Sequence, residues 1–342
     1  MEDVTIRGAG IFGLSIAWEC ARRGAKVTVV DPQGVAAGSS GGIVGALAPH
    51  VPENWNSKKA FQFDSLIMAE AFWNQVEQTG GKSAGYARLG RVQPVLDAAA
   101  LELARQRGQT AKSLWQGLAT WHVTDTAPNW APPSPTGFWI VDTLSARINP
   151  NAACHALAAA LQAKGGQIAQ QADDRGAVLW ATGLHDLLRI SALRGRAFGT
   201  GVKGQAALFD FDRATAPQIF ADTLHFVPHE DGTLAVGSTS EREYEGADTV
   251  DGQLDCLIEK AQQILPELQK APVIKRWAGV RPRSRSRAPV LGAHPIENGA
   301  FIANGGFKIG LGMAPKIAQI MADLILEGRD AIPDEFRPEA SF

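Results

Sequence analysis

The sequence predicts an α/β protein that combines a parallel, nucleotide-binding sheet with an antiparallel sheet. Near the N-terminus, two β-branched runs, at residues 4–6 and 27–30, flank a glycine-rich turn and an apolar pattern of helical period, which together form a βαβ unit. Farther along, residues 193–240 contain short apolar runs separated by turns, which is typical of strands joined by hairpins. The length of 342 residues fits about two average domains.

The composition excludes several classes of protein. A content of 45% hydrophobic and 20% charged residues is that of a globular protein and excludes a disordered or fibrous one. The formal charge of −2 gives no reason to expect a nucleic-acid partner. The three cysteines lie far apart without CxxC spacing, so we expect a reducing compartment and no metal site. Because we find neither a secretory leader nor 18 consecutive apolar residues, we expect a cytoplasmic protein without membrane contact.

The glycine-rich turn has the spacing Gly8-x-Gly10-x-x-Gly13 and lies between a strand and a helix, as in Rossmann-like units. In such a turn, Gly8 permits the tight bend, Gly10 lets the backbone approach a pyrophosphate, and Gly13 lets helix and strand pack closely. The free N–H groups and the dipole of the helix N-terminus favour phosphate. Asp31 directly follows the next strand, at residues 27–30, and is expected to accept hydrogen bonds from ribose hydroxyls.

A second glycine-rich segment, residues 34–42, follows the βαβ unit. Its central residues Ser39, Ser40, Gly41 and Gly42 have small side chains that suit a backbone lying against a cofactor, with N–H groups free for phosphate or ring oxygens. A flexible linker is the alternative. Apolar residues resume at once after Gly42, which argues against that alternative.

The remaining elements follow from periodicity and turn residues. Helical period predicts helices at residues 58–78, 150–164, 254–268 and 313–325, the last with Pro315 in its first turn. Alternating apolar runs predict strands at 206–209, 225–227 and 234–236, and residues 124–136 form a loop. The apolar strand 177–181 ends in Thr182 and Gly183, so Gly183 is expected near the bound cofactor.

In these and other motifs the chain resembles the FAD-dependent D-amino acid oxidase superfamily, particularly its glycine oxidase and sarcosine oxidase branches. The resemblance covers nearly the whole chain, and the order and spacing of the motifs make it specific. The motifs are Gly8 to Gly13 with Asp31, the Gly-Ser run before Pro49, residues 203–205, Val227 and Pro228 with Asp231 and Gly232, residues 236–239, residues 279–282, and residues 305–308 followed by Ala314 and Pro315.

The resemblance implies a cofactor, a domain arrangement and a reaction. The cofactor is FAD, bound non-covalently. An FAD-binding Rossmann-like domain (residues 1–50, 145–190 and 288–342) is interleaved with an antiparallel-sheet substrate domain (residues 51–144 and 191–287). The substrate is a small anionic amine, either glycine, an N-substituted glycine or a D-amino acid. Its C–N bond is oxidised by hydride transfer to flavin, the imine gives a keto acid and an amine, and oxygen or another acceptor reoxidises the flavin.

Two basic residues are the expected catalytic residues. Arg281 matches the family position for carboxylate binding, and its planar guanidinium can hold an α-carboxylate through two parallel hydrogen bonds. The alternative is a solvated basic loop at residues 281–287. Lys308 matches a sarcosine-oxidase-like lysine that helps to hold the carboxylate, and a merely solvated lysine is its alternative. Gly305, Gly306, Phe307 and Lys308 precede the last helix, whose N-terminus is expected to face the flavin.

Two positions of the chain depart from the family pattern. Where relatives often carry a tyrosine in a Tyr-Ile-Val-Pro stretch, this chain has Phe226, which lacks a hydroxyl that could bind substrate. Ala235 is assigned to the lysine that sarcosine oxidases place near the flavin for the reaction with oxygen, and the absence of that lysine argues against a rapid reaction with oxygen. The basic cluster at residues 275–287 favours an anionic, dicarboxylic substrate.

Two other functions stay open. One is a flavin domain that acts on a carboxymethylaminomethyl-modified tRNA base, and the other is an FAD-binding subunit of a larger dehydrogenase complex.

Overall fold

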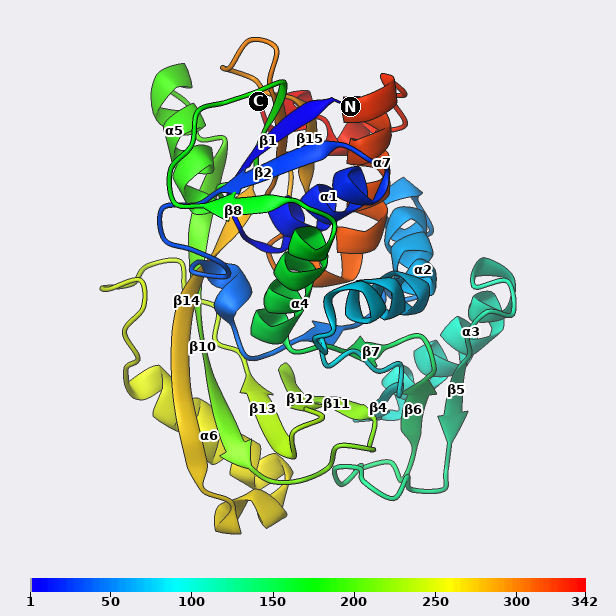
Figure 1. Cartoon of the computed structure of the whole chain (residues 1–342). Helices are drawn as coiled ribbons and strands as arrows, with labels where there is room; N and C mark the ends of the chain where they lie inside the picture. Colours follow the sequence, from blue (N-terminus) through cyan, green and yellow to red (C-terminus); the bar gives the residue numbers. More distant parts are fainter. Residues whose placement is uncertain (1) are drawn as a thin grey trace.

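A six-stranded sheet forms the upper half of the molecule in the computed structural model, which describes residues 2–342 (Figure 1). The strand order is β15-β16-β9-β1-β2-β8, and every pair is parallel except β15 with β16. The strands are β1 (Asp3–Arg7), β2 (Lys26–Val30), β8 (Gln167–Ala169), β9 (Ala177–Trp180), β15 (Val290–Ala293) and β16 (Phe301–Asn304).

Helices from distant parts of the chain cover this sheet. They are α1 (Ile11–Arg22), α2 (Ser57–Gly80), α4 (Pro150–Ala163), α5 (Leu184–Arg194) and α7 (Gly310–Glu327). The helix α1 packs against both α4 and α7, and α2 packs against the same two helices. Buried side chains such as Ile6, Leu14, Leu157 and Ile317 form the shared core of sheet and helices. Burial of this apolar surface is the main stabilisation of the upper half.

An eight-stranded sheet forms the lower half, in the order β14-β10-β13-β12-β11-β4-β6-β5. Its strands are β4 (Arg91–Pro94), β5 (Trp121–Thr124), β6 (Trp139–Asp142), β10 (Gly199–Asp210), β11 (Gln218–Ala221), β12 (Leu224–Pro228), β13 (Thr233–Gly237) and β14 (Val273–Ser284). All pairs are antiparallel except β11 with β4. The helix α6 (Gly252–Ile264) packs on one face, and α3 (Ala98–Leu114) lies beside β5.

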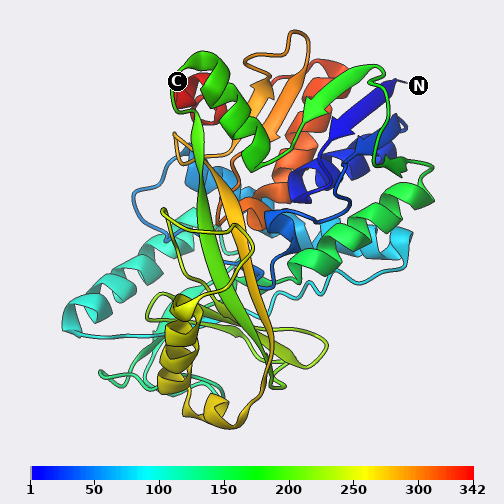
Figure 2. The ribbon, with the colours of Figure 1, turned by 90° about the vertical axis from the view of Figure 1, so that its left-hand side faces the viewer.

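Short elements join the two halves. A two-stranded sheet pairs β3 (Ala46–Leu47) with β7 (Ala146–Arg147). The 3-10 helix η1 (Ser39–Gly41) contacts both α4 and β14. The paired strands β10 and β14 form a long ribbon that reaches from α5 in the upper half to α6 in the lower half (Figure 2). The remaining 3-10 helices are η2 (Pro266–Lys270), η3 (Asp334–Phe336) and η4 (Pro338–Ser341).

The chain order confirms the predicted α/β fold with both a parallel and an antiparallel sheet. The upper sheet takes strands from residues 3–30, 167–180 and 290–304, whereas the lower sheet takes them from residues 91–142 and 199–284. Each sheet is therefore built from separated segments. The domain boundaries given above stay a prediction.

Some predicted elements differ from those of the structure. The helices α3 and α5 and the strands β4, β6 and β11 were not predicted. The sixth helix ends at Ile264 rather than at residue 268, because the residue before Pro266 disfavours helical backbone. Pro315 is the sixth residue of α7 and so lies in its second turn, not its first. Among the described residues, no helix has both the length and the apolar composition needed to cross a membrane.

Candidate functional site

The turn after β1 brings a strand, a helix and a second strand into close contact. Gly8 has a φ of +110°, and its N–H donates to the carbonyl oxygen of Val30 at 2.9 Å. A Cβ on Gly8 would lie 2.4 Å from the oxygen of Ala181, and a Cβ on Gly13 would lie 2.0 Å from the oxygen of Gly8. Gly10 is the N-cap of α1. Only glycine fits at Gly8 and Gly13, which is what a dinucleotide-binding turn requires.

Asp31 follows the last residue of β2 and binds the same turn. Its Oδ2 accepts from the N–H of Ala9 at 2.8 Å, and its Oδ1 accepts from the N–H of Gln33 at 3.0 Å. Each carboxylate oxygen can accept a second hydrogen bond. The side chain is therefore held at the end of β2 with acceptor capacity left over, as ribose binding requires, and that role stays a prediction.

The second glycine-rich segment lies against the N-terminus of α1. The Oγ of Ser40 accepts from the N–H of Ile11 at 3.0 Å, so this serine already takes one of the free N–H groups expected to face phosphate. Ser39 and Ser40 belong to η1 together with Gly41, where a Cβ would lie 2.4 Å from the oxygen of Ala36. A Cβ on the next residue, Gly42, would touch the ring of Trp277 on β14 at 3.4 Å. The segment thus passes between the two sheets.

The carboxyl end of β9 supplies a polar edge beside the turn. Gly183 has a φ of +60° and caps α5, and its carbonyl oxygen accepts from the side-chain amide of Asn304 at 2.8 Å. The Oγ1 of Thr182 is buried and has no hydrogen-bond partner among residues 2–342. An unpaired buried hydroxyl beside a glycine cradle fits a polar ligand at this edge. The residues present therefore fit a bound dinucleotide.

Residues 305–308 join β16 to α7 and pass next to β14. Gly305 has a φ of +74°, and Phe307 has a φ of +43° although it is not glycine. The N–H of Phe307 donates to the oxygen of Pro282 at 3.1 Å. A Cβ on Gly306 would lie 2.8 Å from the ring of Phe12. The segment is therefore fixed on both sides, and it brings Lys308 close to Arg281.

Arg281 lies in β14, opposite Val202 of β10, and not in a solvated loop. Its Nη2 donates to the Oγ of Ser238 at 2.6 Å, and its Nη1 donates to the carbonyl oxygen of Thr239 at 3.4 Å. Burial lowers the pKa of Arg281 to about 10, and the charge of Glu241 opposes that shift. The guanidinium thus stays charged at neutral pH while bound only to neutral acceptors.

Lys308 is the second cation of this region. Burial lowers the pKa of Lys308, and the positive charge of Arg281 lowers it further. Among the described residues, neither cation forms an ion pair with a carboxylate. Two partly buried cations without an anion make a site that favours an anionic ligand.

His225 is a site residue that the sequence prediction missed. Val227 and Pro228 fill the last two places of the Tyr-Ile-Val-Pro pattern, so the tyrosine place is His225, and the assignment to Phe226 was wrong by one residue. Phe226 packs in the core under α6, whereas His225 pairs with Gly237 and lies on the opposite face. Burial lowers the pKa of His225 to about 3, helped by the charges of Arg91 and Lys308, and its Nδ1 has no hydrogen-bond partner within the part of the chain that the structure describes. The strand alternation could have corrected the register.

Comparison with known proteins gives one family and several relatives. A family model described as DAO, FAD dependent oxidoreductase, matches residues 3–324. A glycine oxidase from Pseudomonas aeruginosa is 26% identical over 380 residues, which covers 97% of this chain and 97% of that protein. The bifunctional protein ThiO/ThiG from Nostoc sp. is 26% identical over 353 residues, which covers 95% of this chain but 53% of that protein. The chain thus spans about half the length of that bifunctional relative.

Solved structures resemble the whole chain. A glycine oxidase from Geobacillus kaustophilus has a TM-score of 0.83 at 20% identity and covers 98% of both chains. An iminodiacetate oxidase from Chelativorans sp. BNC1 has a TM-score of 0.82 at 21% identity, also over 98% of both chains. At these identities the likeness establishes a shared fold.

Proposed function

Since the chain belongs to the FAD-dependent oxidoreductase (DAO) family, we propose that it oxidises the C–N bond of a small amino acid. The candidates are glycine, an N-substituted glycine and a D-amino acid. The single observation that carries this proposal is Arg281, a partly buried guanidinium that has no carboxylate partner among the described residues and lies beside Lys308. Glycine oxidases and an iminodiacetate oxidase among the relatives support the same substrate class.

The residues around the turn would hold the cofactor. Gly10 would face the pyrophosphate in the turn that Gly8 and Gly13 allow, and Asp31 would bind the ribose. Ser39, Ser40, Gly41 and Gly42 would lie along the cofactor together with Gly183, while residues 305–308 would lie near its ring. When bound, FAD supplies the acceptor for the hydride that leaves the carbon next to the substrate amine.

Arg281 would hold the α-carboxylate through two parallel hydrogen bonds and so orient the reacting C–H bond. Lys308 would add a second positive charge on the same carboxylate. The neutral imidazole of His225 would offer a hydrogen bond without adding charge. The oxidised substrate is an imine, which water hydrolyses to a keto acid and an amine. Oxygen or another acceptor would complete the cycle.

Addition of the amine substrate under anaerobic conditions should bleach the visible absorbance of the bound flavin. The panel contains glycine, sarcosine, iminodiacetate, several D-amino acids and a carboxymethylaminomethyl nucleoside. Admission of air then tests oxygen, and we expect slow recovery because Ala235 lies in an apolar cluster with Ile43 and Val227. Bleaching by the nucleoside alone would move the assignment to a tRNA base, and no bleaching by any amino acid would refute the proposal.

Gly204→Ala should weaken carboxylate binding without loss of FAD. The Arg281 guanidinium lies across Gly204, and a Cβ there would be 2.0 Å from its Nη1. The guanidinium must move, so we expect the KM for the amino acid to rise roughly tenfold, which corresponds to about 1.4 kcal/mol of lost binding. Gly252→Ala, at a glycine with no heavy atom within 4 Å of the added Cβ, is the control. Equal KM values for the two variants, measured by steady-state kinetics, would contradict the expectation.

A further inference from the structure

A polar network lies on the other face of the strands that carry Arg281, and the role proposed for it rests on the function proposed above. Along β10, Gly204 and Ala206 face the Arg281 side, whereas Lys203 and Gln205 face the α6 side. The segment after β13 continues the pairing, because Glu241 bridges to Lys203. Polar groups on the α6 face therefore lie directly behind the proposed carboxylate site.

Glu241 is the centre of this network. Its Oε1 accepts from the Oγ1 of Thr239 and, at 3.1 Å, from the side-chain amide of Gln205. Its Oε2 lies 3.7 Å from the Nζ of Lys203, which is 0% exposed. Lys203 also lies 3.4 Å from Asp251. Glu241 itself is 6% exposed, so its carboxylate depends on these partners for hydrogen bonds and opposite charge.

Thr239 connects this network to the guanidinium. Its Oγ1 accepts from the N–H of Gln205 at 2.8 Å and donates to Glu241, so its position is fixed from two sides. The carbonyl oxygen of the same residue accepts from Arg281, and the preceding Ser238 provides the other acceptor. The backbone that holds the guanidinium is thus anchored to the buried carboxylate.

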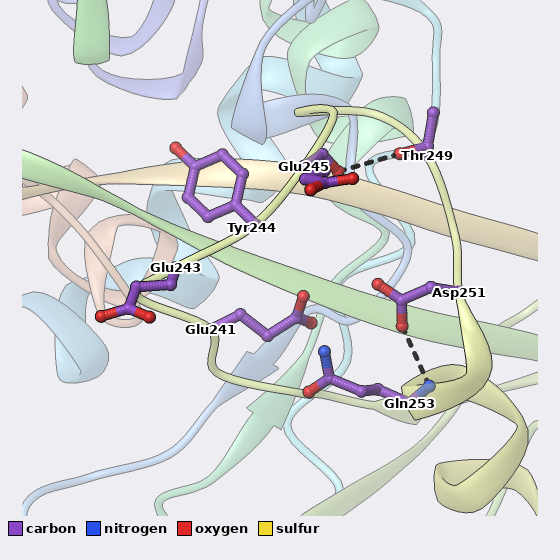
Figure 3. Close-up of a pocket in the computed structure, with 7 residues that line it drawn as sticks. All are labelled: Glu241, Glu243, Tyr244, Glu245, Thr249, Asp251 and Gln253. Atoms are coloured by element: carbon purple, nitrogen blue, oxygen red, sulfur yellow. Dashed lines mark hydrogen bonds between the residues drawn. The ribbon is translucent and has the colours of Figure 1, made fainter.

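Glu243 lies beside Glu241 in the same loop but outside this network. A surface pocket of about 700 Å³ is lined by Glu241, Glu243, Tyr244, Glu245, Thr249, Asp251 and Gln253. Figure 3 shows the Glu241 carboxylate directed toward Asp251, whereas Glu243 points away from both. Glu243 is exposed and therefore offers a control in the same loop.

We propose that Glu241 is a positioning residue that holds the Arg281 guanidinium at the substrate site through Thr239. The negative charge of Glu241 also raises the pKa of Arg281 against the effect of burial. The guanidinium binds a carboxylate only while protonated. Binding is therefore complete below the pKa of Arg281 and is lost as the pH rises through it, so loss of Glu241 should move this alkaline limit to lower pH.

The test uses two variants. Thr239→Val removes the hydroxyl that binds Glu241 and leaves both charges in place, so we expect acetate binding at pH 7 to weaken roughly tenfold. Glu241→Gln keeps the acceptor for Thr239 but removes the charge. The probe is acetate, which has a carboxylate and no amine, and its binding is followed through the absorbance of the bound flavin between pH 7 and 10.5. For Glu241→Gln we expect the alkaline limit to fall by roughly one pH unit. Glu243→Gln should match the wild type.

Separate controls test the effect of the other titratable groups and the folding of the Glu241 variants. Lys308, before α7, also faces Arg281 and has a lowered pKa, whereas His225 on β12 is neutral throughout this range. The comparison is therefore repeated with Lys308→Met. Should Glu241→Gln fail to fold, Lys203→Met with Glu241→Gln removes the buried pair together, and bound flavin per chain reports folding.

Different results would overturn the proposed function and the positioning role of Glu241. If acetate binds Arg281→Ala as tightly as wild type, the carboxylate site of the proposed function is wrong. If Arg281→Ala weakens acetate binding but Thr239→Val binds acetate as tightly as wild type at pH 7, the positioning role is wrong. If the Glu241 variants keep the wild-type pH dependence, the charge effect of Glu241 is wrong.

Discussion

Arg281→Ala should raise the KM for the amino acid substrate by roughly a hundredfold or more while the chain keeps its FAD. Removal of one partner of a buried, hydrogen-bonded charge pair costs about 2–5 kcal/mol, and each 1.4 kcal/mol is about tenfold in binding. The FAD contacts proposed above come from other segments, so flavin content should not change. Steady-state kinetics and the ratio of flavin to protein measure the two effects.

Two further variants sharpen this expectation. Arg281→Lys keeps the charge but loses the planar fork, so it should recover only part of the affinity. Lys275→Ala removes an exposed cation from the same strand and should behave as wild type. A KM for Arg281→Ala within a factor of two or three of wild type would rule out Arg281 as the carboxylate ligand.

Gly8→Ala should give a protein that is less stable and holds little FAD. A Cβ there would lie 2.4 Å from the backbone oxygen of Ala181, so β1 and β9 would have to move apart, and a φ of +110° adds strain for alanine. Gly24 is a matched control, because its φ is +96° but no heavy atom lies within 4 Å of an added Cβ. Gly24→Ala therefore has the backbone strain, of about 1–3 kcal/mol, without the clash.

Thermal unfolding and flavin content distinguish these two variants. We expect Gly8→Ala to lose several degrees more in Tm than Gly24→Ala, and to lose flavin that Gly24→Ala retains. Equal losses of Tm with full flavin in both would mean that the turn tolerates the added methyl group and is not a tight cofactor cradle.

The N-terminal βαβ unit could be predicted from sequence because its signals are local. The expected strands at residues 4–6 and 27–30 agree with β1 and β2 within a residue. Glycine spacing, strand and helix all fall within the same thirty residues, and no distant contact is needed to recognise them. The two types of sheet followed from such local patterns, and the family resemblance then supplied FAD as the cofactor.

Features that depend on distant contacts could not be predicted in this way. The helix α3 buries only Ala104 and Ala111, so it has almost no apolar face to detect. The role of Gly204 depends on the register between β10 and β14, which the local sequence does not specify. Basic residues around Pro282 resemble a solvated loop, yet β14 is an edge strand, where proline is tolerated.

The order of strands in the upper sheet has a consequence for biosynthesis. The strand β1 pairs with β9, and β9 pairs with β16, which is synthesised long after β1. The helix α7, which covers α1, is made later still. During translation the N-terminal unit therefore keeps part of its apolar surface uncovered until β16 and α7 have emerged. We therefore expect the cofactor to bind only after residues 301–327 have been synthesised.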